Sequence, residues 1–318
     1  MKDILKLHEL VLVVILVILF IIFTIMSPNF LNANNLFQIT RQSAELGIIA
    51  LGMSIVLITR GIDLSVGSMA SLTACTVGFL LISGVNPFLA IIIGIVVGAL
   101  LGALNGVLVA LVGLPPILVT LGTMTLFNGI ALALTKGNAF SNFPDAFYII
   151  GHGSLLGIPI PTIIFILLAI IIGVFLSKTR MGISIYAIGS NEEAALFSGL
   201  KIKSILLSVY IFTGILTGIA GIIMASRIST ARADLGESYL LMSVAVAVLG
   251  GIEITGGKGK ITGTVLASLI FAVLANGLNL IDISTFIQTM ITGFVLIFVL
   301  ILGVIIPRWN NLKKWRAT

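Results

Sequence analysis

About ten apolar stretches of roughly 17–25 residues, almost free of charged side chains, follow one another along this 318-residue chain. A helix of about 20 residues crosses the roughly 30 Å hydrocarbon core of a bilayer and satisfies its own backbone hydrogen bonds there. Charged residues make up only 9% of the chain, whereas a soluble domain carries about 25%. The sequence therefore predicts an all-α polytopic membrane protein, with residues 1–318 forming one transmembrane domain.

The positions of the apolar stretches predict the spans, with boundaries accurate to a few residues. The first stretch is interpreted as a retained helix and not a signal peptide, because it is long and no small-residue cleavage pattern follows it. The eighth is short for a bilayer and precedes a glycine-rich segment, which predicts a broken or tilted helix. The predicted spans are residues 10–26, 43–59, 64–83, 87–111, 116–135, 160–177, 205–226, 239–252, 261–281 and 286–306.

The positive charges predict the orientation of the chain. With the N-terminus in the cytoplasm and ten spans, thirteen of the seventeen Lys and Arg residues fall on the cytoplasmic side, where short loops carry such an excess. Both termini are therefore expected in the cytoplasm. The basic tail 308–316, with its two Trp residues, is expected to lie at the membrane interface, so the net charge of +6 does not imply nucleic-acid binding.

The two halves of the chain share residues at a constant offset of 171 positions. Asp63 recurs as Asp234 and Asn105 recurs as Asn276, each followed by the same residue in both copies. An internal duplication is predicted, with halves at about 43–135 and 205–306 and a cytoplasmic coupling loop at about 178–204. Each period holds five spans, so the second half is expected upside down, as in the inverted repeats of many transporters. The two Asp residues are expected to cap the helices that follow them.

No residues suited to covalent chemistry are grouped in the sequence. It has no Ser/His/Asp grouping, no paired carboxylates and no Cys/His cluster with metal-ligand spacing. The glycine-rich segment 256–262 fails the phosphate-loop pattern, because neither of its lysines is followed by Ser or Thr. No enzymatic activity, cofactor or metal site is therefore expected in this chain.

The acidic residues bear on how transport would be driven. All lie near predicted span ends or in loops, so nothing in the sequence suggests coupling to a proton or sodium gradient. Energy is expected to come from a partner. A stand-alone secondary carrier is the first alternative, and an integral-membrane enzyme or scaffold is the second.

The coupling loop contains the sequence signals of a short amphipathic helix over residues 189–199. Ser190 is expected to cap its N-terminus, Glu193 to complete a capping box, and Gly199 to end it. Ala194, Ala195 and Phe197 would then offer a compact face to a partner. The alternative is a solvated connector that lies on the membrane.

Several segments resemble those of one family of transport proteins. Residues 193–199 resemble the E-A-A-x-x-x-G signature of permease subunits of ABC importers. Residues 59–68 resemble the G-G-I-D-L-S-V-G-S segment of ribose-type sugar permeases, with Arg60 in place of the first glycine. Further similar segments are residues 104–106, 114–124 and 248–259, and the likeness covers about residues 35–305.

The resemblance implies a permease of the branched-chain amino acid/sugar family, with the type II architecture of vitamin importers and about ten helices. Its substrate would be a pentose, hexose, rhamnose or autoinducer-2, and a nucleoside or branched-chain amino acid is the alternative. The implied partners are ABC ATPase domains that use ATP and Mg, an extracytoplasmic sugar-binding protein, and a second copy or homologous permease. The implied location is the prokaryotic cytoplasmic membrane.

The resemblance also assigns roles to two segments. The turn with Gly113, Pro115 and Pro116 would form the cytoplasmic gate, and the two prolines impose a break because they cannot continue a helix. The ATPase-coupling residues would be Ser190, Asn191, Glu192, Glu193, Ala194, Ala195 and Gly199.

Spans five and ten line the path in the architecture that the resemblance implies. Their uncharged polar residues would offer hydrogen bonds to a neutral polyol without trapping it. The alternative is that these residues bond neighbouring helices or their own backbone. The candidates are Thr120, Thr123, Thr125, Asn128, Gln288, Thr289 and Thr292.

Overall fold

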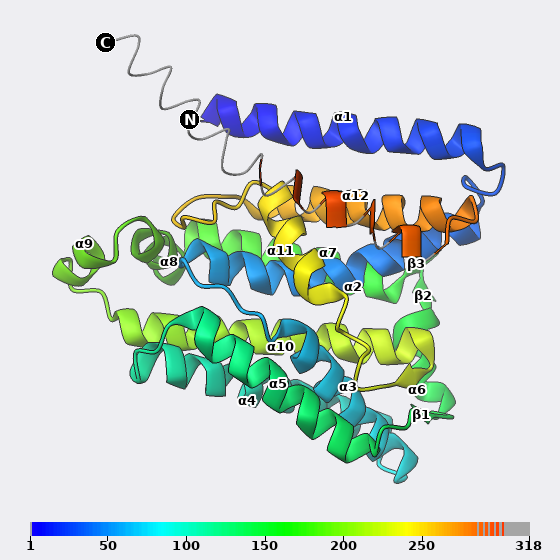
Figure 1. Cartoon of the computed structure of the whole chain (residues 1–318), viewed down its shortest axis with the longest axis horizontal. Coiled ribbons are helices and arrows are strands. Elements are labelled where there is room, and N and C mark those ends of the chain that lie inside the picture. Colours follow the sequence, from blue (N-terminus) through cyan, green and yellow to red (C-terminus); the bar gives the residue numbers. More distant parts are fainter. Residues whose placement is uncertain are drawn as a thin grey trace.

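The computed structural model describes residues 2–284 and, beyond them, 286–288, 290–291, 293–295, 297–298 and 301, with side chains from His8 onward. The described part is a bundle of helices that lie mostly along one direction (Figure 1). Helix α1 lies at one edge of the bundle, where it packs against α12. The all-α polytopic fold predicted from the sequence is confirmed.

The elements begin and end close to the predicted spans, and prolines open several of them. Pro87 and Pro116 occupy first-turn positions of α4 and α5, where the missing N–H costs no hydrogen bond. The helices are α1 (Lys2–Met26), α2 (Ala33–Ile58), α3 (Val66–Ile82), α4 (Pro87–Gly106), the π-helix η1 (Val107–Leu111), α5 (Pro116–Thr135), α6 (Asp145–His152), α7 (Ile160–Lys178), α8 (Arg180–Ser190), α9 (Glu192–Phe197), α10 (Ile202–Ile228), α11 (Tyr239–Leu249) and α12 (Ile261–Leu280). The strands are β1 (Phe140–Ser141), β2 (Ser154–Leu155), β3 (Ile158–Pro159) and β4 (Thr230–Ala231).

Within the described residues, seven helices are long and apolar enough to cross a membrane: α1, α2, α4 with η1, α5, α7, α10 and α12. Among the shorter apolar helices, α3 has 17 residues and α11 has 11. Helix α11 is the short eighth span, and a glycine-rich loop follows it. Part of the predicted span 286–306 and all of the basic tail 308–316 lie outside the described residues, so the count of ten stays a prediction.

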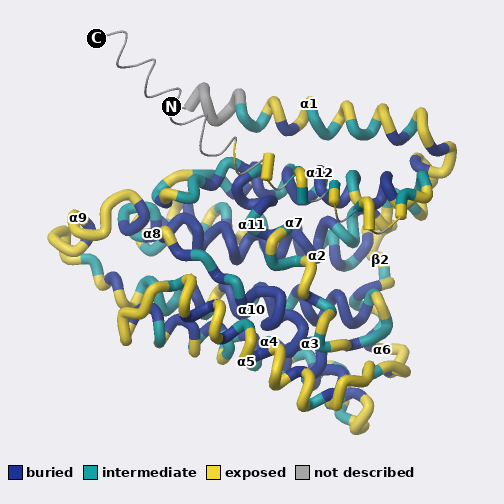
Figure 2. The backbone as a smooth tube through the Cα atoms, in the orientation of Figure 1, coloured by how far each residue is buried: buried dark blue, intermediate teal, exposed yellow. Residues whose placement is uncertain are grey.

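Small residues bring α4 and α10 into close contact. A Cβ atom added at Gly98 would lie 2.5 Å from the carbonyl oxygen of Gly214, and one at Gly102 would overlap the carbonyl oxygen of Tyr210. The glycines of α4 recur every fourth residue, which places them on one face and lets the two backbones approach. Helix α10, with α2 and α3 beside it, forms the buried centre of the bundle (Figure 2).

The helix bounds follow the 171-residue offset. Shifted by 171 positions, the bounds of α2 become 204–229, and α10 runs Ile202–Ile228. The same shift moves α4 to 258–277, and α12 runs Ile261–Leu280. Helices α2 and α10 run in opposite directions along the bundle (Figure 1). These are the relations that an inverted repeat requires.

The repeated polar residues do not make equivalent contacts. The Asp63 carboxylate accepts hydrogen bonds from the backbone N–H (2.9 Å) and hydroxyl (2.6 Å) of Ser65, and Asn105 donates to the same Ser65 hydroxyl (2.8 Å). Asp234 instead pairs with Arg232 at the surface, and Asn276 donates to Asn35 Oδ1 (2.8 Å).

The capping predicted for Asp63 and Asp234 is wrong in both halves. Helix α3 begins after Ser65 and α11 after Ser238, so neither aspartate holds the N-cap position. Asp63 forms a turn with Ser65 just before α3. The carboxylate of Asp234 accepts a hydrogen bond from Arg232 instead of capping a helix.

One acidic residue lies deeper than the sequence predicted. Helix α2 begins at Ala33, ten residues before the predicted span, which puts Glu45 midway along it and fully buried. The Arg227 side chain donates two hydrogen bonds to its carboxylate, at 2.5 and 2.9 Å, and the Tyr239 hydroxyl donates a third at 3.0 Å. Glu45 is therefore an interior anion with its partners in place, and not a span-end residue.

The end of the bundle opposite α9 carries the two short sheets. Strand β1 pairs antiparallel with β4, and β2 pairs antiparallel with β3 (Figure 1). Helix α6 is tied to α10 nearby, since the Ser226 hydroxyl donates to the Phe147 carbonyl (2.7 Å) and accepts from the Gly151 N–H (2.9 Å). The segment between α5 and α7 is thus fastened to the second half of the chain.

Candidate coupling surface and transport path

Helices α8 and α9 project from one end of the bundle (Figure 1). Asn191 is the N-cap of α9, and its side chain accepts a hydrogen bond from the Ala194 N–H at 3.0 Å. The predicted cap at Ser190 is wrong by one residue, because the Ser190 hydroxyl donates to the Tyr186 carbonyl within α8 (2.9 Å). The capping box with Glu193 is also wrong, since Ala194 now occupies its position three residues after the cap.

The exposed face of α9 differs in part from the predicted one. Ala195 is buried against Ile188 and Ile202, so it supports α9 and offers nothing to a partner. Phe197 is 90% exposed and Leu196 is 60% exposed. The α9 surface, defined here as the exposed residues of this helix, consists of Glu192, Glu193, Ala194, Leu196 and Phe197.

Gly199 ends the coupling element as the sequence predicted. Its φ of +79° lies in the left-handed region, which a glycine adopts without steric cost. The Leu200 N–H then donates to the carbonyl of Ala195 (3.2 Å), and α10 begins at Ile202. The α9 surface is thereby joined through a tight turn to the central helix of the bundle.

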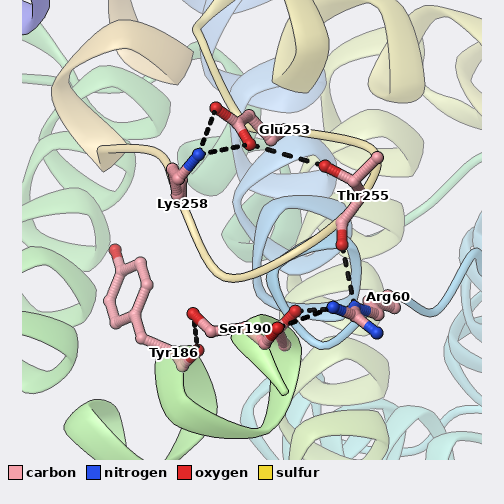
Figure 3. Close-up of polar contacts among 7 residues, drawn as sticks. Arg60, Tyr186, Ser190, Glu253, Thr255 and Lys258 are labelled. Carbon is pink, nitrogen blue, oxygen red and sulfur yellow. Dashed lines mark hydrogen bonds and ion pairs between the residues drawn. The ribbon is translucent and has the colours of Figure 1, made fainter. Parts of the chain in front are cut away.

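Arg60 lies beside the end of α8 (Figure 3). Its Nε donates to the carbonyl oxygens of Gly189 (2.7 Å) and Thr255 (2.9 Å), and its Nη2 donates to that of Ser190 (2.7 Å). The last carbonyls of a helix have no partner within it and carry the negative end of the helix dipole. The guanidinium of Arg60 donates hydrogen bonds to these carbonyls and places a positive charge beside the negative end of the α8 dipole.

The loop between α11 and α12, residues 250–260, packs against the same place. The Gly257 N–H donates to the Ile58 carbonyl (2.8 Å), and the Tyr186 hydroxyl donates to the Gly259 carbonyl (3.0 Å). Burial raises the pKa of Tyr186, which keeps this donor protonated at neutral pH. Within the loop, Lys258 pairs with Glu253 at 3.2 Å (Figure 3).

The proposed gate residues lie between η1 and α5. Gly113 has φ +85° and open space around its Cα, and Pro115 and Pro116 begin α5. A π-helix such as η1 is uncommon and often marks a functional position. An apolar groove of about 300 Å³ lies beside this turn, lined by Leu108, Leu114, Pro115, Leu118, Val119, Gly122 and Thr123.

A second cavity, of about 300 Å³, lies between α3, α5 and the start of α11. This volume is at the lower end of the range for ligand pockets. Neutral hydrogen-bonding groups and one carboxylate enter it among apolar side chains. The polar residues that line it are Ser68, Ser71, Thr125, Asn128 and Glu237.

The residues predicted to line the transport path lie in different surroundings in the structure. Asn128 lies on this cavity, whereas Thr120 is fully buried and donates to the carbonyls of Ile62 (3.1 Å) and Pro116 (2.9 Å). Thr123 is buried between its own helix and the apolar groove. Both hydroxyls donate to backbone carbonyls, as the alternative interpretation describes, and the role of these residues in lining the path stays a prediction.

The remaining lining candidates belong to the tenth predicted span. The Gln288 amide donates to the Ile283 carbonyl at 2.7 Å. Thr289 and Thr292 lie outside the described residues.

The described residues contain no group of three or more His, Cys, Asp or Glu side chains that could hold a metal ion. Cys75 is buried, and burial among apolar neighbours makes a thiol inert.

Comparison with known proteins decides the family. The profile described as the permease component of the branched-chain amino acid transport system matches residues 35–300. The chain belongs to this permease family. The ribose import permease RbsC of Bacillus subtilis is 44% identical to the permease over 281 residues, covering 88% of this chain and 87% of that protein.

Other relatives extend the range of solutes. The D-allose transport system permease AlsC of Escherichia coli is 36% identical, over 86% of this permease and 84% of AlsC. The autoinducer 2 import system permease LsrD of Escherichia coli is 34% identical, over 92% and 90%. These relatives are named as transport permeases and not as enzymes. The permease is therefore an ABC importer subunit, as the sequence resemblance predicted. No solved structure matches the chain.

Sequence reasoning missed part of the site. Ser68, Ser71 and Glu237 were not predicted to line a cavity, because their positions before and within short helices carry no periodic signal. Arg60 was noticed only as a departure from a glycine. Its contacts lie 129 to 195 residues away in the sequence and have no local signature.

Proposed function

We propose that the permease is the membrane-spanning subunit of an ATP-driven importer for a monosaccharide in a prokaryotic cytoplasmic membrane. The observation that carries the substrate class is the 44% identity to a ribose import permease. A second relative is named for allose. The cavity beside Asn128 supports the proposal, since hydroxyl and amide groups can exchange hydrogen bonds with a neutral polyol.

The importer would contain partners at both ends of the permease. The α9 surface would bind ABC ATPase domains that consume ATP and Mg²⁺ on the cytoplasmic side, with both termini of the permease on that side. The end that carries β1–β4 and α6 would receive an extracytoplasmic sugar-binding protein. A second permease, identical or homologous, would complete the path.

Transport would follow from movement between these ends. ATP-driven closure of the ATPases would push on α8 and α9, and the helices would switch from outward-open to inward-open. The turn at Gly113, Pro115 and Pro116 would act as the cytoplasmic gate, because two prolines fix a break that the neighbouring helices can open or close around. The residues of this chain would carry no covalent step.

Uptake by cells tests the substrate class. A strain that lacks this permease but retains its ATPase and binding protein should regain uptake of radiolabelled ribose when the permease is restored. Unlabelled monosaccharides should compete, and leucine should not. Restored uptake of leucine with no uptake of any monosaccharide would contradict the proposal.

A second solute deserves the same test, because the autoinducer 2 permease matches 92% of the chain. Autoinducer 2 and ribose would each be offered to the restored strain at equal concentration. Faster uptake of autoinducer 2 would assign the permease to that solute within the same transport mechanism.

A further inference from the structure

The ends of α2 and α8 and the loop 250–260 meet at one side chain, Arg60 (Figure 3). This residue makes no ion pair with any described side chain, and the acceptors of its three hydrogen bonds are backbone carbonyls of α8 and the loop. Bonds from a charged donor are about twice as strong as neutral ones. Because the acceptors are backbone atoms, Arg60 holds the elements themselves and not particular side chains.

The backbone of Arg60 is unusual as well. Its φ of +64° lies in the left-handed region, where the sugar-permease segment that this stretch resembles has glycine. This conformation is sterically unfavourable for a residue with a side chain and is not so for glycine. The conformation aims the guanidinium at the end of α8, so the contacts of the side chain offset the cost of holding it there.

Each of the three elements leads to a different part of the transport machinery. Helix α8 leads directly to α9 through the N-cap Asn191. The segment after Arg60 leads to α3, which lines the cavity with Ser68 and Ser71. The loop 250–260 follows α11, and the start of α11 lines the cavity with Leu240. A movement of α9 can therefore reach α3 and α11, two of the three helices around the cavity, through the contacts of Arg60.

The geometry assigns to Arg60 the role of a positioning residue that passes movement of the coupling helices α8 and α9 to α3 and α11 at the cavity. The inference rests on the proposed function, since it needs an ATPase that acts on α9. Tyr186 makes a weaker, parallel link, because its hydroxyl bonds the same loop through one neutral hydrogen bond.

The test uses the assembled complex of permease, ATPase and binding protein in proteoliposomes, with sugar uptake and ATP hydrolysis measured together. The main variant is Arg60→Gly, which removes the guanidinium but suits the left-handed backbone, so folding is preserved. ATPase binding and hydrolysis should persist, while sugar transported per ATP falls about tenfold. Arg60→Lys keeps one charged donor and should recover part of that ratio.

Two further variants make the result specific. Lys136→Gly removes another cation with a left-handed backbone (φ 52°), at the end of α5 away from this contact, and should leave sugar per ATP unchanged. Tyr186→Phe should lower the ratio less than Arg60→Gly does. A wild-type ratio in Arg60→Gly would overturn the assignment, and so would a loss of ATPase binding equal to the loss of uptake.

The two proposals fail in different ways. If the wild-type complex imports no monosaccharide, the proposed function is wrong. If the wild-type complex imports sugar and Arg60→Gly imports it with equal efficiency, the proposed function stands and only the role of Arg60 is wrong.

Discussion

Glu45 places a carboxylate inside the bundle, and a single cation neutralises it. It has no exposed surface, and Arg227 and Tyr239 supply the three hydrogen bonds that its carboxylate accepts. The pair joins the middle of α2 to the end of α10, two helices at equivalent positions in the repeat. A buried ion pair of this kind adds little net stability, but breaking it leaves an uncompensated charge.

Removal of the cation therefore has a large expected effect. Arg227→Ala should destabilise the permease by about 3–5 kcal/mol, because it leaves the buried Glu45 carboxyl without its cationic partner. Thermal unfolding in detergent measures the change. Arg232→Ala is the control, since its pair with Asp234 is exposed and should matter little. Equal melting temperatures for wild type and Arg227→Ala would contradict the prediction.

The exposed pair of Arg232 and Asp234 makes the stability of the permease depend on pH, and the sign of this dependence can be predicted. A hydrogen bond from Arg232 lowers the pKa of the Asp234 carboxyl below its ordinary 3.8. A lowered folded-state pKa contributes stability above the unfolded value, and this contribution is lost as the pH falls through the folded value. Wild type should therefore melt slightly above Asp234→Asn at pH 7, and the two should converge in acid. A difference that grows on acidification would have the wrong sign.

At the scale of whole elements, α4 and α10 depend on backbone contact. Gly98→Ala should cost about 1–3 kcal/mol, because the new methyl group would meet the Gly214 carbonyl at 2.5 Å. Gly173→Ala in α7 is the matched control, since open space surrounds that glycine. Thermal unfolding of the two variants should differ accordingly. Equal stability would show that α4 and α10 can separate without penalty.

The α9 surface gives a prediction about binding and not stability. Phe197 is 90% exposed, so Phe197→Ala should leave the melting temperature unchanged. An aromatic anchor in a protein interface is worth about 2 kcal/mol or more, which corresponds to roughly 30-fold weaker ATPase binding. Binding of the purified ATPase to the permease measures this. Leu155→Ala, an exposed apolar residue at the opposite end, should bind normally; equal binding by Phe197→Ala would remove α9 from the interface.

Hydropathy located most helices, but it did not give their first residues, their caps or the burial of single side chains. It missed the first ten residues of α2, because polar side chains such as Asn34, Asn35 and Gln38 dominate them. The capping-box pattern placed the α9 cap at Ser190, since Ser and Asn are both good caps and only the backbone distinguishes them. Hydropathy could not show that Ala195 is buried, because the covering residues Ile188 and Ile202 lie on neighbouring helices.

For the whole molecule, the sequence predicted a repeat but not the different contacts that the polar residues of its two halves make. The constant offset predicted matching helices, and the bounds of α2 and α10 agree with it. The different contacts of Asp63 and Asp234 depend on Ser65 and Arg232, which occupy non-equivalent positions in the two halves. The contacts of Arg60 likewise depend on the assembled bundle.

The central claim is that the permease receives its energy through α9 and generates none itself. The most direct measurement is sugar accumulation in proteoliposomes that contain the permease with or without its ATPase and binding protein. With the ATPase and ATP inside the vesicles and the binding protein outside, sugar should accumulate inside against its gradient. Without the ATPase, neither a proton nor a sodium gradient should drive accumulation. Gradient-driven accumulation by the permease alone would contradict the account.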